Sequence, residues 1–348
     1  MTSLEVLAMV LCTISCSSYE DKPSVILIII DTLRADHLSC YGYERITSPV
    51  LDSLAATGTI WANANSNASW TLPATASIWT GVAPKSHGVT MSLATGNVFG
   101  ISPETPVLPM AMKSNGYQTA GFFNVYLFSP YFGFHKGFDR YDCTEKGHDR
   151  AEETVDMAIQ WLEEIDHEKP FFLTVHLFDV HAPYDPPAPF NTLFCNDETD
   201  GKSYWDISEN GDILHPEQLE HLMGLYDGEI AQVDSELGRL FRTVRDLELD
   251  QKTLIIVTAD HGEEFLEHGY VGHGKNLFQE TVHIPLITSG TEVAAGAVRH
   301  ETVAQFDIFP SILSYCACLT DNRFDGISFF SESLPENRFI PASEINRA

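Results

Sequence analysis

Positive charge is scarce in this sequence of 348 residues. Only 20 lysines and arginines stand against 49 aspartates and glutamates, which gives a formal net charge of -29. An electric field of this sign repels polyanions, so the composition argues against nucleic acid as a partner. We expect most of the acidic residues to form a solvated surface. A small anionic substrate would need a local positive centre, which a bound divalent metal ion could supply.

Long apolar runs are missing as well. The apolar stretch from Leu4 to Cys16 is too short to span a bilayer as a helix. Because polar residues 17–22 follow it, we interpret residues 1–22 as a signal peptide or lipoprotein leader, which predicts export and a periplasmic location. Ser15 before Cys16 suggests lipidation of that cysteine and an anchor in the membrane. The alternatives are a misassigned start and a disordered tail.

Cysteine is rare, and repeats, low-complexity tracts and heptad runs are absent. The seven cysteines are an odd number and are scattered. Cys316-Ala-Cys318 is too closely spaced for an ordinary disulfide and lacks the companion residues of a zinc site. We therefore expect core thiols, with one disulfide possible.

Hydrophobic residues make up 44% of the chain, enough for a large core. Three apolar runs (24–30, 171–178 and 253–258) are typical of strands that are buried on both faces of a sheet. Further strands are expected over 58–64 and 117–123, and helices over 49–57, 71–79, 105–115, 152–165 and 219–247. This alternation favours one wound α/β domain over residues 23–348, with 186–212 as a surface insertion.

Three of the predicted buried strands end in ionisable residues. Asp31, the pair Asp179 and His181, and the pair Asp260 and His261 each follow such a strand. Because ligands bind at the carboxyl ends of parallel strands, these side chains are candidates for one site. Neighbouring carboxylates repel each other unless a cation lies between them, and oxygen with imidazole ligands suits a divalent metal. The simpler interpretation of a single strand-end aspartate is a turn residue or helix N-cap.

A hydroxyl stands at the predicted start of a helix in the segment from Asn67 to Gly81. Thr71 begins this helix, and Pro73 is tolerated in its first turn. A helix N-terminus stabilises negative charge, and a hydroxyl placed there on a metal ion becomes a nucleophile. Thr71 is otherwise an ordinary N-cap residue.

The chain resembles the sulfatase family of the alkaline-phosphatase superfamily over roughly residues 24–330. The motifs that carry the resemblance occur in the family's order: Asp31 after a buried strand, Thr71-x-Pro73, Pro84–Val89, Gly116-Tyr117-x-Thr119, His181-Ala-Pro183-Tyr184, Tyr226–Asp234, Asp260-His261-Gly262, Gly274-Lys275, Asp307–Ser311 and Asp325-Gly326. The resemblance implies a large, mostly parallel sheet flanked by helices. It also implies a C-terminal lobe, of which Arg338–Ala348 would be only the first strand.

The resemblance further implies a set of site residues. Thr71 would be the nucleophile, on a divalent ion (Ca, Mn or Zn) that Asp31, Thr71, Asp260 and His261 hold. Catalytic roles for His181 and Lys275 follow from the same motifs: His181 would protonate the leaving oxygen and Lys275 would bind the anionic head. We expect Arg34, Asn124 and His273 to contact the substrate. A second metal site would use Asp179, His181, His268 and His273.

The sequence departs from the sulfatase pattern at positions whose side chains bind or attack the sulfate group in that family. The family's Cys or Ser, which is converted to formylglycine, is Thr71, and the following Arg is Thr75. Thr32 replaces the second Asp, and Gly121–Asn124 replaces the Gly-Lys-Trp-His segment. These changes favour phosphate or phosphonate esters over sulfate esters, because family members that act on phosphoesters use an unmodified threonine.

The leading hypothesis is thus a hydrolase of small anionic esters, including those on sulfated or phosphorylated glycans or lipids. Two alternatives stay open. One is a transferase that moves a phospho-alcohol head group, although such enzymes usually carry several membrane spans. The other is a non-catalytic binding protein that retains the fold.

Overall fold

The computed structural model describes residues 22–91, 96–144, 150–195, 216–335 and 338–344. The predicted leader and most of the predicted insertion lie outside these residues, so their roles stay predictions. Within the part of the chain that the structure describes, every helix is too short or too polar to cross a membrane.

A central sheet of eight strands organises the molecule, in the order β12-β2-β11-β8-β1-β7-β5-β6. Its middle strands are β1 (Ser24–Ile30), β7 (Phe171–Leu177) and β8 (Thr253–Ala259), and every residue of all three is buried. β1 pairs in parallel with both β7 and β8. The three apolar runs therefore form the strands predicted for them, because side chains on both faces of these strands pack against helices.

The sheet is mixed because one strand is reversed. β11 (Leu286–Ser289) runs antiparallel to β2 (Thr59–Asn65) and to β8, whereas the other pairings are parallel. β5 (Gln118–Phe123) confirms a predicted strand. The sequence did not predict β11, β6 (Arg140–Cys143) or β12 (Ala297–Ala304). The last two are partly exposed edge strands, so they lack the continuous apolar run that marks a central strand.

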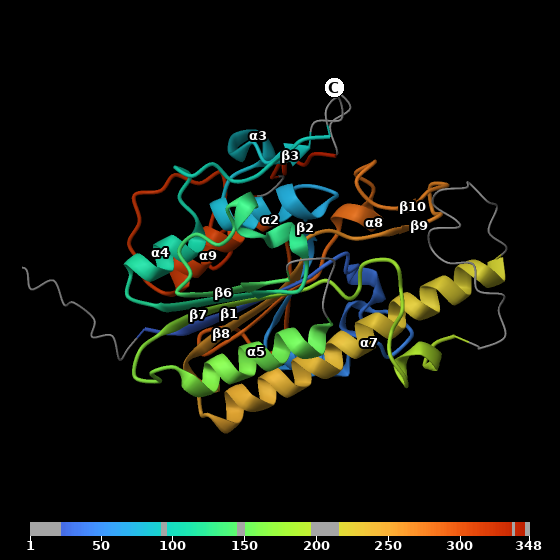
Figure 1. Cartoon of the computed structure of the whole chain (residues 1–348), viewed down its shortest axis with the longest axis horizontal. Coiled ribbons are helices and arrows are strands. Elements are labelled where there is room, and N and C mark those ends of the chain that lie inside the picture. The colour runs from blue at the N-terminus through green and yellow to red at the C-terminus, as the bar shows by residue number, and fades with distance from the viewer. Residues whose placement is uncertain (1–21, 92–95, 145–149, 196–215, 336–337, 345–348) are drawn as a thin grey trace, which may run out of the picture.

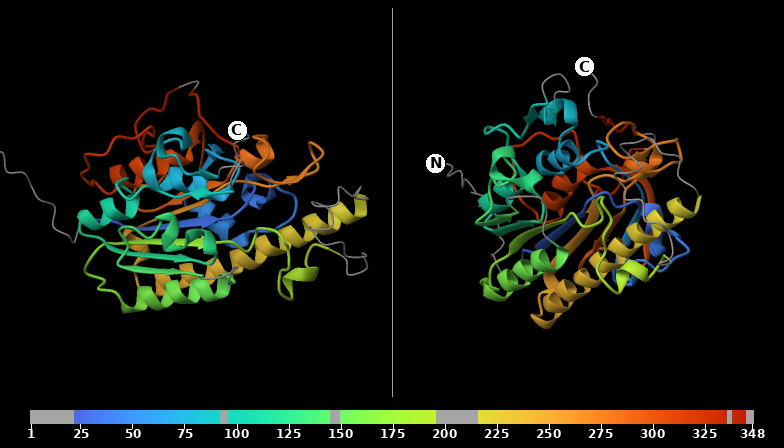
Figure 2. Two further views of the ribbon diagram at one scale, coloured as in Figure 1. Left: turned by 45° about the horizontal axis from the view of Figure 1, so that its top comes forward. Right: turned by 45° about the vertical axis from the view of Figure 1, so that its right-hand side comes forward.

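Helices cover both faces of the sheet (Figure 1). α5 (Ala151–Glu164) and α7 (Pro216–Asp246) lie together on one face, and α1 (Pro49–Ala56) packs against α7. On the other face lie α2 (Thr71–Thr80), α4 (Leu108–Ser114) and α9 (Ile308–Tyr315), as the two views in Figure 2 also show. Short elements fill the connections: α3 (Pro84–His87), α8 (Gln279–Val282), and the hairpins β3 (Thr90–Met91) with β4 (Val98–Phe99) and β9 (Glu264–Phe265) with β10 (Val271–Gly272).

The predicted helices are all present, with small differences at their ends. α4 begins at Leu108 rather than at residue 105, because Pro109 is accommodated only in the first turn of a helix. α7 is one continuous helix of 31 residues. α2 ends at Gly81, whose φ of 69° is left-handed, and a Cβ there would lie 2.5 Å from the Phe324 ring.

The last residues that the structure describes return to the start of α2. Ser343 exchanges backbone hydrogen bonds with Asn67 (2.9 Å) and Ser69 (3.2 Å), and Arg338 forms an ion pair with the buried Asp307. The predicted first strand of a C-terminal lobe is thus represented by an isolated bridge between Ala68 and Ser343. This contact holds the segment before α2 in place.

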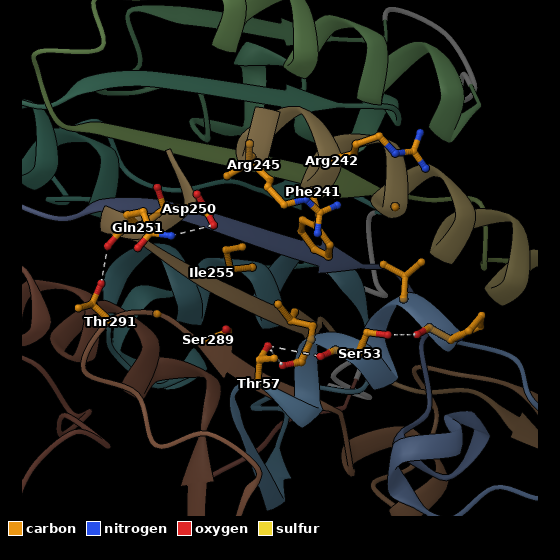
Figure 3. A pocket seen from close by; sticks show the side chains of 17 residues that line it. Ser53, Thr57, Phe241, Arg242, Arg245, Asp250, Gln251, Ile255, Ser289 and Thr291 are labelled. Atoms are coloured by element: carbon orange, nitrogen blue, oxygen red, sulfur yellow. Dashed lines mark hydrogen bonds between the residues drawn. The ribbon is translucent and has the colours of Figure 1, made fainter. Parts of the chain in front are cut away.

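A surface groove of about 770 Å³ lies at the other end of β8 (Figure 3). α1, α7 and the first residues of β8 line it, including Phe241, Arg245 and Ile255. Asp260 follows the opposite end of the same strand, so this groove is separate from the strand-end cluster.

Candidate metal centre and catalytic site

Asp31 and Asp260 meet because the strands before them are neighbours. Ile30 of β1 and Ala259 of β8 are paired in register, so the residue after each strand emerges at the same edge of the sheet. Both aspartates and His261 are fully buried. One ligand atom from each of these three residues lies within 4.8 Å of the others. The structure therefore confirms that the predicted metal ligands come together.

The carboxylates are oriented so that one oxygen of each is left for a cation. Asp260 Oδ1 accepts the backbone N–H groups of His261 (2.8 Å) and Thr32 (3.1 Å). Its Oδ2, like Oδ1 of Asp31, has no hydrogen-bond partner among the described residues. Buried carboxylate oxygens without partners are costly unless a positive charge compensates them. This arrangement fits a divalent metal.

His261 presents its second ring nitrogen to the same space. Its Nδ1 lies 2.9 Å from the carbonyl oxygen of Gly262, to which it donates in the tautomer assigned from this contact. Nε2 then carries a lone pair and lies 3.5 Å from Asp260 Oδ2 and 3.9 Å from Asp31 Oδ1. A histidine fixed in this way by a backbone carbonyl is the usual form of a metal ligand.

The electrostatics of the cluster oppose two free carboxylates. Burial, followed by the charges of Asp260 and Glu263, raises the pKa of Asp31 well above its ordinary value. Burial likewise raises the pKa of Asp260 to about 7. Burial and then the charge of His273 lower the pKa of His261, so its imidazole is neutral. A divalent cation would reverse this balance by stabilising both ionised carboxylates.

Thr32, at the position of the family's second aspartate, holds the two strand ends together. Its φ of 53° is left-handed, which is strained for a β-branched residue. Its hydroxyl donates to the carbonyl of Val180 (2.9 Å), and its own carbonyl accepts the Tyr226 hydroxyl (2.8 Å). The strained backbone thereby directs the Thr32 N–H at Asp260.

The Thr71 hydroxyl faces two candidate metal ligands and does not cap its helix. It is the first helical residue of α2, after the extended Trp70, and it is 3% exposed. Its Oγ1 lies 3.5 Å from Asp31 Oδ2 and 3.4 Å from His261 Nε2. The hydroxyl therefore sits between two candidate metal ligands at a helix N-terminus, and the alternative of an N-cap is wrong.

Two further histidines, His273 and His181, form a row of ring contacts with His261. The His273 ring lies 4.4 Å from that of His261 and 5.0 Å from that of His181, centre to centre. Nδ1 of His273 is 2.9 Å from Glu263. Burial lowers the pKa of His273, but the Glu263 carboxylate outweighs it and the net pKa is raised. His181 stacks on Phe178 and contacts the Ala182 carbonyl through Nδ1 (2.6 Å).

Two other predicted residues contact protein groups outside the cluster. Lys275 is exposed, with its ammonium 3.9 Å from the centre of the Tyr270 ring. The Arg34 guanidinium binds Asp36 (2.7 Å) and Glu267 (2.5 Å). Their contacts with an ester stay predictions.

Asn124 connects two strand ends, and its contact with an ester stays a prediction. It donates to Asp179 (2.7 Å) and accepts the Phe178 N–H (2.7 Å). Asp179 also accepts the Ala151 N–H, so both of its carboxylate oxygens have donors. His268 contacts Glu280. The structure therefore does not bring the residues of the predicted second metal site together, because the Asp179 carboxylate is hydrogen-bonded to Asn124 and Ala151.

Sequence reasoning missed two buried residues beside the site. Glu263 follows the Asp260-His261-Gly262 motif directly and binds both His273 and the Tyr184 hydroxyl. His176, inside the apolar run of β7, lies 3.6 Å from Asp31. A charged residue next to a ligand motif and a histidine in an otherwise apolar strand were the available signals.

The sulfatase family model matches residues 23–316. Fold, strand-end cluster and this match agree, and the chain belongs to the sulfatase family. Arylsulfatase K of Mus musculus is 23% identical, covering 89% of this chain and 63% of the relative. An arylsulfatase of Clostridium perfringens is 24% identical, covering 88% and 77%. This chain thus spans less than two thirds of the length of that first relative.

Solved structures show the same fold. The phosphonate monoester hydrolase of Agrobacterium radiobacter superposes with a TM-score of 0.75 at 22% identity, covering 88% of this chain and 76% of that one. BT4656, solved in complex with its substrate D-glucosamine-2-N,6-O-disulfate, gives 0.71 at 21% identity, covering 88% and 79%.

Proposed function

We propose that the chain hydrolyses phosphate, phosphonate or sulfate esters with Thr71 as nucleophile, on a divalent ion held by Asp31, Asp260 and His261. The observation that carries this proposal is the position of the Thr71 hydroxyl, within 3.5 Å of both Asp31 and His261. Relatives named as sulfatases and as phosphonate monoester hydrolases support the class of reaction.

The bound metal would acidify the Thr71 hydroxyl and offset charge on the ester's anionic head. Thr71 Oγ1 then gives up its proton to solvent and forms a bond to phosphorus or sulfur, while the bond to the alcohol oxygen breaks on the opposite side. The N-terminus of α2 stabilises negative charge at the attacked group. Water afterwards cleaves the covalent threonine ester and regenerates the hydroxyl.

Two histidines serve the leaving alcohol and the anionic head in this proposal. His181 supplies the proton that the departing oxygen takes up, since imidazole titrates in the useful range. His273 adds positive charge beside the site because Glu263 favours its protonated form. Both rings are held through Nδ1, by the Ala182 carbonyl for His181 and by Glu263 for His273.

Phosphorus esters are the favoured substrates. Threonine cannot become formylglycine, because the methyl group on Cβ blocks formation of the aldehyde. Thr75 and Phe122 stand where the family places cationic side chains against sulfate. The ligand set of two carboxylates, an imidazole and a hydroxyl suits Zn²⁺, Mn²⁺ or Ca²⁺.

A panel of nitrophenyl phosphate, phosphodiester, phosphonate and sulfate substrates, assayed with and without chelator, tests the proposal. We expect turnover of a phosphorus ester that chelation abolishes. Thr71→Ala should lose turnover and keep the metal, which metal analysis after gel filtration measures.

Thr80→Ala is the matched control, because Thr80 lies on the same helix and its hydroxyl bonds the Ala76 carbonyl. Full activity of Thr71→Ala would remove this hydroxyl from the mechanism. Metal binding without turnover of any ester would favour the non-catalytic alternative, and transfer to added glycerol would favour the transferase.

A further inference from the structure

A buried histidine beside the metal cluster has no assigned role. His176 is the second-last residue of β7 and is fully buried. Neither of its ring nitrogens has a hydrogen-bond partner within the described residues. The nearest acidic group is Asp31, whose Oδ2 lies 3.6 Å from His176 Nε2.

Packing alone does not explain an imidazole at this position. The His176 ring lies 4.4 Å from that of Phe128 and 6.3 Å from that of Phe123. In such aromatic surroundings, a polar ring without partners is less favourable than phenylalanine or leucine. The imidazole is therefore expected to have a partner in the working state of the protein.

The two oxygens of Asp31 are in different surroundings. Oδ2 lies on the side of His176 and Thr71, whereas Oδ1 is the oxygen nearest to His261 and has no hydrogen bond in the described part of the chain. A donor to Oδ2 would fix the carboxylate plane and leave Oδ1 for a cation.

We propose that His176 is a positioning residue of the metal site, which donates from Nε2 to Asp31 Oδ2 so that Oδ1 binds the metal. This inference rests on the metal site of the proposed function. The separation of 3.6 Å exceeds a hydrogen bond by several tenths of an ångström. A small rotation of the Asp31 carboxylate closes it.

A neutral donor suits this task because it adds no positive charge that would compete with the cation. Hydrogen bonds to ligating carboxylates commonly change metal affinity by about 10- to 100-fold when they are removed.

The test compares metal dissociation constants of the full chain, measured with Zn²⁺ or Mn²⁺ against a fluorescent chelator. His176→Phe and His176→Leu remove the donor and keep an apolar side chain. His176→Gln keeps a donor, since its amide nitrogen reaches about as far as Nε2. His87→Gln is a matched control, because His87 is buried and bonds Ser77 of α2.

We expect the metal dissociation constant to rise 10- to 100-fold in His176→Phe and His176→Leu. His176→Gln should recover part of the lost affinity, and His87→Gln should leave the dissociation constant unchanged. Melting temperatures in EDTA should equal that of the unsubstituted protein or exceed it. A folded donorless variant with unchanged affinity would overturn the inference, as would loss of folding in both donorless variants in EDTA. If the unsubstituted protein binds no metal, the proposed function itself fails.

Discussion

Replacing Asp260 by asparagine should stabilise the metal-free protein and at the same time prevent metal binding. Asp260 is fully buried, its Oδ2 lacks a hydrogen-bond partner among the described residues, and Asp31 adds a second negative charge nearby. Asparagine removes the charge. Its carbonyl oxygen can still accept the two N–H groups, from His261 and Thr32, that Asp260 Oδ1 accepts.

The magnitude follows from the pKa of Asp260, which burial raises from 3.8 to about 7. Between these values the folded state holds a proton that the unfolded state has released, so the free energy of unfolding falls as pH rises through this window. About three pKa units correspond to about 4 kcal/mol at pH 8. Structural relaxation around the buried charge reduces this energy. We therefore expect Asp260→Asn to raise the free energy of unfolding by about 2–4 kcal/mol at pH 8.

Urea unfolding in EDTA at pH 4.5 and pH 8, followed by metal titration, measures both effects. The stability gain should be small at pH 4.5, where Asp260 is protonated in the folded state. Asp307→Asn is the control, because Asp307 is equally buried but paired with Arg338 and should lose stability. An Asp260→Asn protein less stable than the parent at pH 8, or with the same gain at both pH values, would refute the reasoning.

The two remaining predictions concern a second buried carboxylate and a glycine beside the ligands. Burial raises the pKa of Glu229 to about 8, so the free energy of unfolding should fall as pH rises from about 4.5 to 8. Glu229→Gln should remove part of this slope in urea titrations; equal slopes would contradict the assignment. A Cβ on Gly262 would lie 2.0 Å from the Glu280 carbonyl oxygen. Gly262→Ala should therefore lower the melting temperature and weaken metal binding, since His261 is anchored on the Gly262 carbonyl; unchanged values of both would show that the backbone adapts.

The core of the fold and the meeting of the candidate metal ligands were predictable because one physical pattern specifies both. β-branched runs buried on both faces imply central parallel strands, and parallel strands bring their carboxyl ends to one edge. Asp31 and Asp260 follow two such runs, so their meeting did not require knowledge of the loops. The pairing of Ile30 with Ala259 then places the two aspartates that follow them side by side.

The direction of β11 and the edge strands were not predictable in this way. Leu286–Ser289 is a four-residue segment, too short for its periodicity to reveal whether it runs parallel or antiparallel. β12 alternates half-buried and exposed residues over most of its length, including Arg299 and Glu301, and an edge strand of this composition resembles a loop. Pairing with β2 decides its structure, and that pairing is a tertiary interaction.

Side-chain directions in the loops were equally beyond the sequence pattern. Motif order identifies Lys275 and Asn124 as family positions, but not what each side chain contacts. Lys275 lies over Tyr270, and Asn124 bonds Asp179 because its neighbours offer complementary groups. Whether either side chain contacts a substrate stays a prediction.

The acidic composition would give the proposed metal ion a second role in this site. Arg34 is neutralised by Asp36 and Glu267, and the exposed Lys275 lies over an aromatic ring. An anionic ester approaching a chain of net charge -29 would therefore meet little positive potential from these two side chains. The helix N-terminus supplies partial charge, and protonated His273 is balanced by Glu263. In the proposed function, the cation that would keep Asp31 and Asp260 ionised would then also be the group that attracts the anionic ester.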